Sequence, residues 1–267
     1  MDLFKSAGVN RKLFLILLFA GILAYFALIP YIMSLSVVSK EQLPPVPFPV
    51  LISAMIAQAV VLFSIAIYTG LFLGKKVGLG APILEGWLNS ETVKKQFRSI
   101  LKISIILGVL VGICLFFLDR IVFAFFIEPI TAFQAKPPLW QRFLVSFYGG
   151  INEEIVMRLF LMTLIVWISS KIRKTQAGLP TAFGFWIAII LISVVFGLGH
   201  LPMTARFQHI TALVVFRAVL LNGIAGVVFG WLYWKKGLES AMIAHFSADI
   251  MLHVILPSVL FVIPKTP

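Results

Sequence analysis

Long apolar runs alternate with short polar connections along the whole chain. Seven of these runs approach or exceed the roughly 20 apolar residues that a helix needs to cross a bilayer. They cover residues 13–33, 50–73, 100–118, 143–168, 187–206, 210–234 and 240–262. The runs lack the short alternating segments of a membrane barrel, so the pattern predicts helices, which satisfy their own backbone in lipid. We therefore expect an all-α, polytopic transmembrane helix bundle.

Two connections need separate treatment. The proline-rich stretch PPVPFP, at 44–49, predicts a turn after the first span. The stretch FAFFIEPITAF lies within 119–142 and is apolar but short, and Glu128-Pro129 interrupts it. It fits an interfacial or re-entrant piece, and the alternative is part of an eighth span.

The basic residues predict the orientation. They concentrate at alternate connections, near 5–12, 75–98, 171–174 and 235–236. Positively charged connections stay on the cytoplasmic side, so this bias predicts seven spans with a cytoplasmic N-terminus. The run 13–33 is too long for a signal peptide and lacks a cleavage site, so we expect an uncleaved first span.

The composition agrees with a membrane protein. The chain is 61% hydrophobic and 12% charged, and its mean hydropathy is +1.06. Its net charge of +12 is scattered between apolar runs, which favours contact with anionic lipids and argues against nucleic acid. The single Cys114 excludes an intramolecular disulfide and a multi-cysteine metal site.

Ionisable residues inside the predicted spans are the candidates for chemistry, because burying them in lipid is costly. Glu154 and Arg158 are one helical turn apart and can form an ion pair. Glu153 points elsewhere and has no local cation, which suits a general base acting on water. The alternative is that both carboxylates are structural and that Glu153 bonds to a polar group of a neighbouring helix.

Histidines occur in two later spans. His200 follows Phe196 by four residues and could hold water, stabilise an oxyanion or bind metal, or simply bond between helices. His245, Asp249 and His253 form one stripe on the last helix. Asp249 beside His245 would fix the imidazole tautomer, and the competing pair is Asp249 with His253.

Other polar residues of the spans have weaker signals. Asn222 lies mid-span beside the small residues of a GxxxG step, Gly226 and Gly230, which favours close helix packing. It could line a cavity, but we interpret it as bonding across helices. His209 and Arg217 are expected near the membrane interface.

Glu153, His200 and His245 are the right types for a His2Glu zinc site. However, the sequence has no HExxH motif, and the three ligands would come from separate helices. A metal-free site with zinc as the alternative is therefore the prediction.

Three motifs in order carry a resemblance. EExxxR at 153–158, FxxxH at 196–200 and HxxxD at 245–249 lie in that order on three of the predicted spans, and a Gly-rich span precedes the last of them. The chain resembles the CAAX protease and bacteriocin-processing membrane proteins, and within them the type II CAAX prenyl endopeptidases. The likeness covers about residues 140–255. On this basis we expect N-terminal helices of unassigned role at 1–135 and a catalytic transmembrane domain at 136–267.

The resemblance implies a helical bundle with an internal polar cavity and peptide-bond hydrolysis by water. Glu153 would activate the water, His200 would help to hold it, and His245 with the residue at 249 would stabilise the oxyanion. Glu154 and Arg158 would support the site. The prenyl endopeptidases have Asn where this chain has Asp249, and an ionised Asp cannot donate a hydrogen bond.

The implied substrate is a peptide or lipidated peptide, with prenylated CAAX peptides as one class. The implied location is the plasma membrane of a prokaryote. Three other functions compete with a metal-free endopeptidase: a zinc protease using the same residues, a non-catalytic bacteriocin-immunity or scaffold protein, and a proton-coupled transporter. The chain lacks the internal repeat common in transporters.

Overall fold

All seven predicted spans form helices. The computed structural model describes residues 8–35, 47–127 and 137–260, and within them seven helical segments are long and apolar enough to cross a membrane. These described residues form no strand, only an isolated bridge between Lys174 and Pro180. The all-α polytopic bundle is confirmed. The spans are Arg11–Ser34, Pro49–Val77, Lys94–Phe125, Leu139–Ile172, Ala182–Thr204, Ala212–Lys236 and Leu238–Leu260.

Several spans consist of more than one element. The elements are α2 (Arg11–Ser34), α3 (Phe48–Val77), α4 (Pro82–Leu88), α5 (Lys94–Ile121), η2 (Phe123–Phe125), α6 (Leu139–Phe147), η4 (Tyr148–Glu153), η5 (Ile155–Met162), α7 (Thr163–Ile172), α8 (Ala182–Gly199), α9 (Leu201–Thr204), α10 (Ala212–Lys236), α11 (Leu238–Asp249), η6 (Ile250–Ile255) and α12 (Leu256–Leu260). The side chains of Asn10, Thr181 and Thr211 cap α2, α8 and α10 by accepting backbone N–H bonds.

The connection between the third and fourth spans adds no further span within the described residues. α5 continues to Ile121 and a short 3-10 turn, η2, follows it, so the first part of 119–142 extends the third span. Glu128-Pro129 and the start of the PPVPFP stretch lie outside the described residues.

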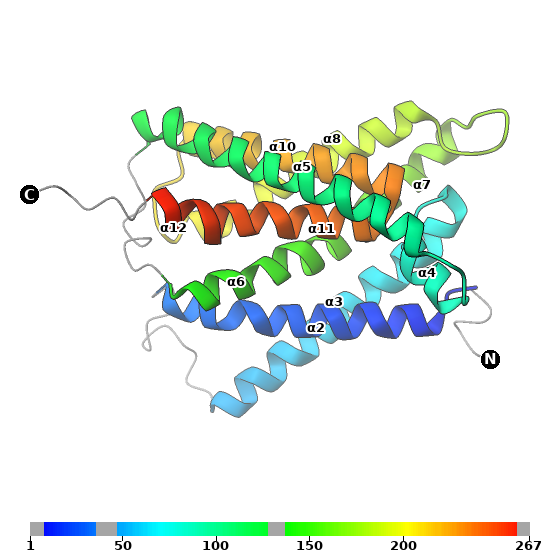
Figure 1. Ribbon diagram of the computed structural model, residues 1–267, viewed down its shortest axis with the longest axis horizontal. Coiled ribbons are helices and arrows are strands. Elements are labelled where there is room, and N and C mark those ends of the chain that lie inside the picture. Colours follow the sequence, from blue (N-terminus) through cyan, green and yellow to red (C-terminus); the bar gives the residue numbers. More distant parts are fainter. Residues whose placement is uncertain (1–7, 36–46, 128–136, 261–267) are drawn as a thin grey trace, which may run out of the picture.

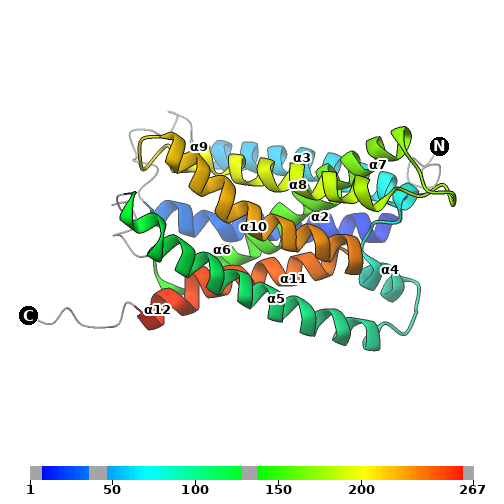
Figure 2. The same ribbon diagram turned by 90° about the horizontal axis from the view of Figure 1, so that it is seen from above.

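The first half of the last span, α11, is packed inside the bundle. α11 runs between α5 and α6, and α12 ends at the opposite end of the molecule from the start of α2 (Figure 1). From above, α8, α10, α11 and α5 follow one another across the bundle (Figure 2). α10 thus lies between α8 and α11, the carboxylate-bearing stretches η4 and η5 pack against α11 and α8, and α5 covers α11 on its other side.

Small residues let these helices approach closely. A Cβ at Gly108 of α5 would overlap Ala244 O of α11. A Cβ at Gly226 would lie 2.7 Å from Ser193 Oγ, so the predicted GxxxG step of α10 packs directly on α8. Close helix contact through small residues is the usual packing mode in lipid, where the hydrophobic effect does not draw helices together.

Candidate active site

Two π-helical stretches border the motif residues. η4 ends at Glu153 and η5 begins at Ile155, so both adjacent carboxylates lie where these stretches meet. A third stretch, η6, begins immediately after Asp249. π-Helical turns are rare and are found mostly at functional sites, where they change the direction of a side chain.

Glu154 and Arg158 form a fully buried ion pair. Arg158 Nη1 lies 2.9 Å from Glu154 Oε1, and the two side chains are 1% and 0% exposed. The guanidinium lies over the rings of Phe196 and Phe229, and Nη2 donates to Gly226 O on α10. The predicted pair therefore exists, and it also fastens the fourth span to α8 and α10.

His245 is held by the same carboxylate. Its Nδ1 lies 2.7 Å from Glu154 Oε1, and its Nε2 lies 3.6 Å from Glu153 Oε2 and 3.7 Å from Asp249 Oδ1. A carboxylate on Nδ1 fixes the imidazole tautomer. That carboxylate is Glu154, whereas the sequence interpretation assigned this part to Asp249.

Glu153 is the accessible carboxylate of the adjacent pair. Its side chain is 22% exposed, against 0% for Glu154. Asp249 is 14% exposed, and its Oδ1 lies between His245 and His253, 4.0 Å from His253 Nε2. Water can therefore reach part of both side chains.

Aromatic rings form the wall around the imidazoles. The His245 ring stacks on Phe229 at 4.7 Å between centroids and meets the edge of Phe196 at 5.8 Å. Phe196 also packs edge-on against His200, at 4.9 Å. The FxxxH and HxxxD motifs thus meet through one shared phenylalanine ring.

His200 lies at a break in its span. The sequence analysis expected a helix continuing past Pro202, but α8 ends at Gly199 and the short α9 follows. Pro202 has no N–H, so a carbonyl of the preceding turn loses its helical donor. His200 Nδ1 bonds to Phe196 O at 2.8 Å, which turns Nε2 away from the backbone.

Two glycines bring the carboxylate helix against the histidine helix. A Cβ at Gly149 would overlap Asp249 Oδ2 and would lie 3.0 Å from His245 Nε2. A Cβ at Gly150 would meet Phe246 and Met242 O of α11. The sequence analysis missed both residues, although a Gly-Gly pair just before two carboxylates in a span was an available signal. It also missed Phe229, for which no local signal exists.

The remaining candidates lie around this cluster. Asn222 Nδ2 donates to Ala218 O of its own helix at 2.9 Å, so this bond does not cross helices as expected. His253 packs against the Tyr31 ring of α2. Arg217 makes a two-bond ion pair with Asp119 of α5, at 2.6 and 2.9 Å.

The zinc alternative can be compared with the donor geometry. Among the described residues, no group of three or more His, Cys, Asp or Glu side chains has an arrangement suited to a metal ion. His245 Nδ1 is already bonded to Glu154, and the Phe196 ring packs against both His200 and His245. A chelator tests the zinc alternative directly.

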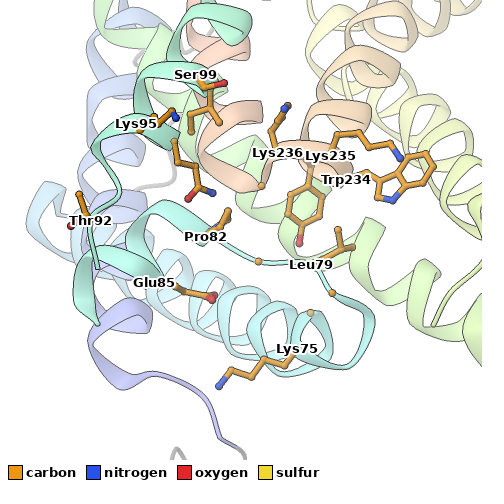
Figure 3. A pocket seen from close by; sticks show the side chains of 17 residues that line it. Lys75, Leu79, Pro82, Glu85, Thr92, Lys95, Ser99, Trp234, Lys235 and Lys236 are labelled. Atoms are coloured by element: carbon orange, nitrogen blue, oxygen red, sulfur yellow. The ribbon is translucent and has the colours of Figure 1, made fainter. Parts of the chain in front are cut away.

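A cavity of about 810 Å³ lies elsewhere, at the end of the bundle where α3 and α10 finish and α5 begins. Figure 3 shows three of its lysines, Lys75, Lys95 and Lys236, which come from these three helices. No motif residue lines it. Its basic lining matches the connections that the sequence places on the cytoplasmic side.

Comparison with known families addresses the same part of the chain. Residues 135–251 match a family model described as Type II CAAX prenyl endopeptidase Rce1-like. The matched segment includes all three motifs, so the resemblance indicated by the motifs is confirmed. No curated protein and no solved structure is significantly similar to the chain.

Proposed function

Because residues 135–251 are Rce1-like, we propose that this chain is an integral-membrane endopeptidase in which Glu153 activates the hydrolytic water. One observation carries the proposal. Of two adjacent carboxylates, Glu154 is buried against Arg158 and His245 Nδ1, while Glu153 is partly open and faces His245 Nε2. A general base needs an oxygen that water can reach, and only Glu153 of the pair offers one.

The hydrolysis then follows in two steps. Glu153 takes a proton from water as the water oxygen bonds to the scissile carbonyl carbon, which gives a tetrahedral oxyanion. The oxyanion collapses, the C–N bond breaks, and Glu153 returns the proton to the leaving amine. His200 Nε2, turned away from its own backbone, is the group that we assign to holding the water.

His245 is the group that we assign to the oxyanion. In the imidazolium form both ring nitrogens carry a hydrogen, so Nδ1 remains on Glu154 while Nε2 donates to the substrate. Preorganised donors of this kind are worth about 2.7–4 kcal/mol in the transition state. Asp249 Oδ1 lies 3.7 Å from the same Nε2, close enough to favour the imidazolium form by its charge.

Peptides with a prenylated CAAX end are the proposed substrates, because the matched family is described by them. We assign catalysis to 136–267, which contains every motif, in the plasma membrane of a prokaryote. The N-terminal helices then serve to enclose the site, as α3 packs on η5 and α5 packs on α11.

The direct test uses purified protein in detergent and a quenched fluorescent farnesylated CAAX peptide. Wild type should cleave the peptide, and Glu153→Gln should lose about 10²–10⁴-fold in rate, the usual contribution of a general base. Activity should survive a zinc chelator. Loss of activity on chelation would favour the zinc alternative, and an inactive but folded wild type would return weight to an immunity role.

Glu91→Gln is the matched control, because Glu91 is an exposed carboxylate in the connection before α5. It should cleave at the wild-type rate. Equal loss in both variants would mean that neutralising any glutamate harms the preparation, and the assignment of Glu153 would fall.

A further inference from the structure

A second arginine, Arg142, lies at the far end of the same site. It belongs to the first turn of α6, and its Nη1 donates to His253 O at 3.2 Å. Its Nε is buried and has no hydrogen-bond partner. A buried guanidinium hydrogen without an acceptor is unfavourable, so an acceptor is expected there when the site is in use.

Arg142 lies close to the catalytic cluster, through its contact with the last span. His253, to which it bonds, carries on the stripe of His245 and Asp249, and Asp249 Oδ1 lies 4.0 Å from His253 Nε2. The Tyr31 ring of α2 meets the His253 ring edge-on. Four elements thus converge on one region beyond Asp249.

No acidic residue in the described part of the chain forms an ion pair with Arg142 within 4.0 Å. The two other interior arginines differ from it in this respect. Arg158 is paired with Glu154, and Arg217 is paired with Asp119. A planar guanidinium matches a carboxylate better than any other common group, through two parallel N–H bonds.

We propose that Arg142 is the residue that binds the C-terminal carboxylate of the peptide substrate. The proposal rests on the proposed endopeptidase function with its CAAX substrates, and it adds the residue that recognises the end of the peptide. The ligand is an α-carboxylate, and the residue is a determinant of specificity, since it touches the substrate but not the reacting atoms.

The geometry also sets the length of the released peptide. His253 follows His245 by eight residues, which is about 12 Å along a helix. An extended peptide advances about 3.3 Å per residue, so about three or four residues fit between the scissile bond and Arg142. A CAAX end has three residues after its cysteine, which agrees with this length.

The test compares two farnesylated CAAX peptides of one sequence, one ending in a free carboxylate and one in a carboxamide. Wild type should cleave the acid with a kcat/KM about tenfold or more above that of the amide, the worth of one charge-assisted pairing. Arg142→Gln should cleave both alike, and Arg142→Lys should keep part of the preference. The ratio is measured on one preparation, so partial misfolding of a variant does not change it.

The matched control is Arg206→Gln, which removes an exposed arginine following α9. It should keep the wild-type ratio. A structural role of Arg142, limited to anchoring His253 O, would lower stability without altering the ratio. Equal cleavage of acid and amide by wild type, or a preference that survives in Arg142→Gln, would overturn the proposal and leave the protease function standing.

A binding assay tests the carboxylate site even if the proposed hydrolysis is wrong. In the Glu153→Gln background, the affinity of each uncleaved peptide is measured by fluorescence anisotropy, and the acid should bind about tenfold more tightly only while Arg142 is present. If wild type cleaves neither peptide but the acid shows this binding, the proposed hydrolysis fails and the carboxylate site stands. If neither peptide binds, the carboxylate site is refuted as well.

Discussion

Glu154 Oε1 lies 2.7 Å from His245 Nδ1, and the same oxygen lies 2.9 Å from Arg158 Nη1. A single buried oxygen therefore joins the fourth span to the last one and connects both to the arginine that is fastened to α10. Glu154 therefore holds the helices together, whereas its neighbour Glu153 remains accessible to water and is the proposed general base.

This division predicts unequal losses of stability for two neighbouring substitutions. Glu154→Gln leaves Arg158 as a buried cation without its anion, which typically costs about 3–5 kcal/mol. Glu153→Gln removes no close partner of an arginine and should cost about 1 kcal/mol or less. Thermal unfolding in detergent checks both, and equal loss of stability in the two variants would contradict the division.

The close approach at Gly149 predicts a loss of activity on adding one methyl group. Gly149→Ala would push a Cβ into Asp249 Oδ2 and crowd His245 Nε2. We expect cleavage of the farnesylated CAAX peptide to fall about tenfold or more, since small displacements of catalytic groups are costly.

Gly223→Ala serves as the control for Gly149→Ala. A Cβ at Gly223 would meet nothing within 4 Å, and the residue lies in the interior of α10. This variant should keep full activity and gain about 0.5–1 kcal/mol in stability from better helix propensity. If both variants behaved alike, steric crowding would not be the cause.

Asp249 is expected to tolerate an amide better than a methyl group. Its Oδ1 faces His245 Nε2 at 3.7 Å, while Glu154 already holds Nδ1. Asp249→Asn keeps an oxygen acceptor and gains a donor, so its kcat should stay within about tenfold of wild type, whereas Asp249→Ala should lose about 10²-fold. A dead Asp249→Asn beside an active Asp249→Ala would contradict this expectation, because both variants lack the charge and only the amide could then be harmful.

The Arg217–Asp119 pair predicts a modest coupling between α5 and α10. The two hydrogen bonds are well formed, but the side chains are 24% and 29% exposed, so water reduces the contribution of the pair to the free energy of unfolding. A double-mutant cycle of Arg217→Gln and Asp119→Asn should give a coupling energy of about 0.5–1 kcal/mol. Additive effects on the unfolding free energy would mean that the pair contributes nothing.

The basic connections predict which end faces the cytoplasm. Single cysteines replacing Ser90 or Ala205, both exposed and at opposite predicted sides, are introduced into a Cys114→Ser background. In intact cells a membrane-impermeant maleimide should label the cysteine at 205 and spare the one at 90. The reverse pattern would place the N-terminus outside.

The sequence by itself determined the fold class and the candidates. Unbroken apolar runs of span length leave helices as the only way to satisfy the backbone in lipid, and each predicted run is found in one span. The i,i+4 spacing of Glu154 and Arg158 was sufficient to predict their pair, because both lie on one helix face.

Only the tertiary structure decided how the motifs combine. Contacts between helices depend on where glycines allow close approach and where Pro202 interrupts α8, and no spacing along one helix encodes these contacts. The packing brings His245 Nδ1 within hydrogen-bond distance of Glu154 and sets the Arg158 guanidinium over the rings of Phe196 and Phe229. It also leaves the Glu153 side chain partly exposed. It also set Arg142 beside His253, a neighbour more than a hundred residues away that helical periodicity cannot indicate.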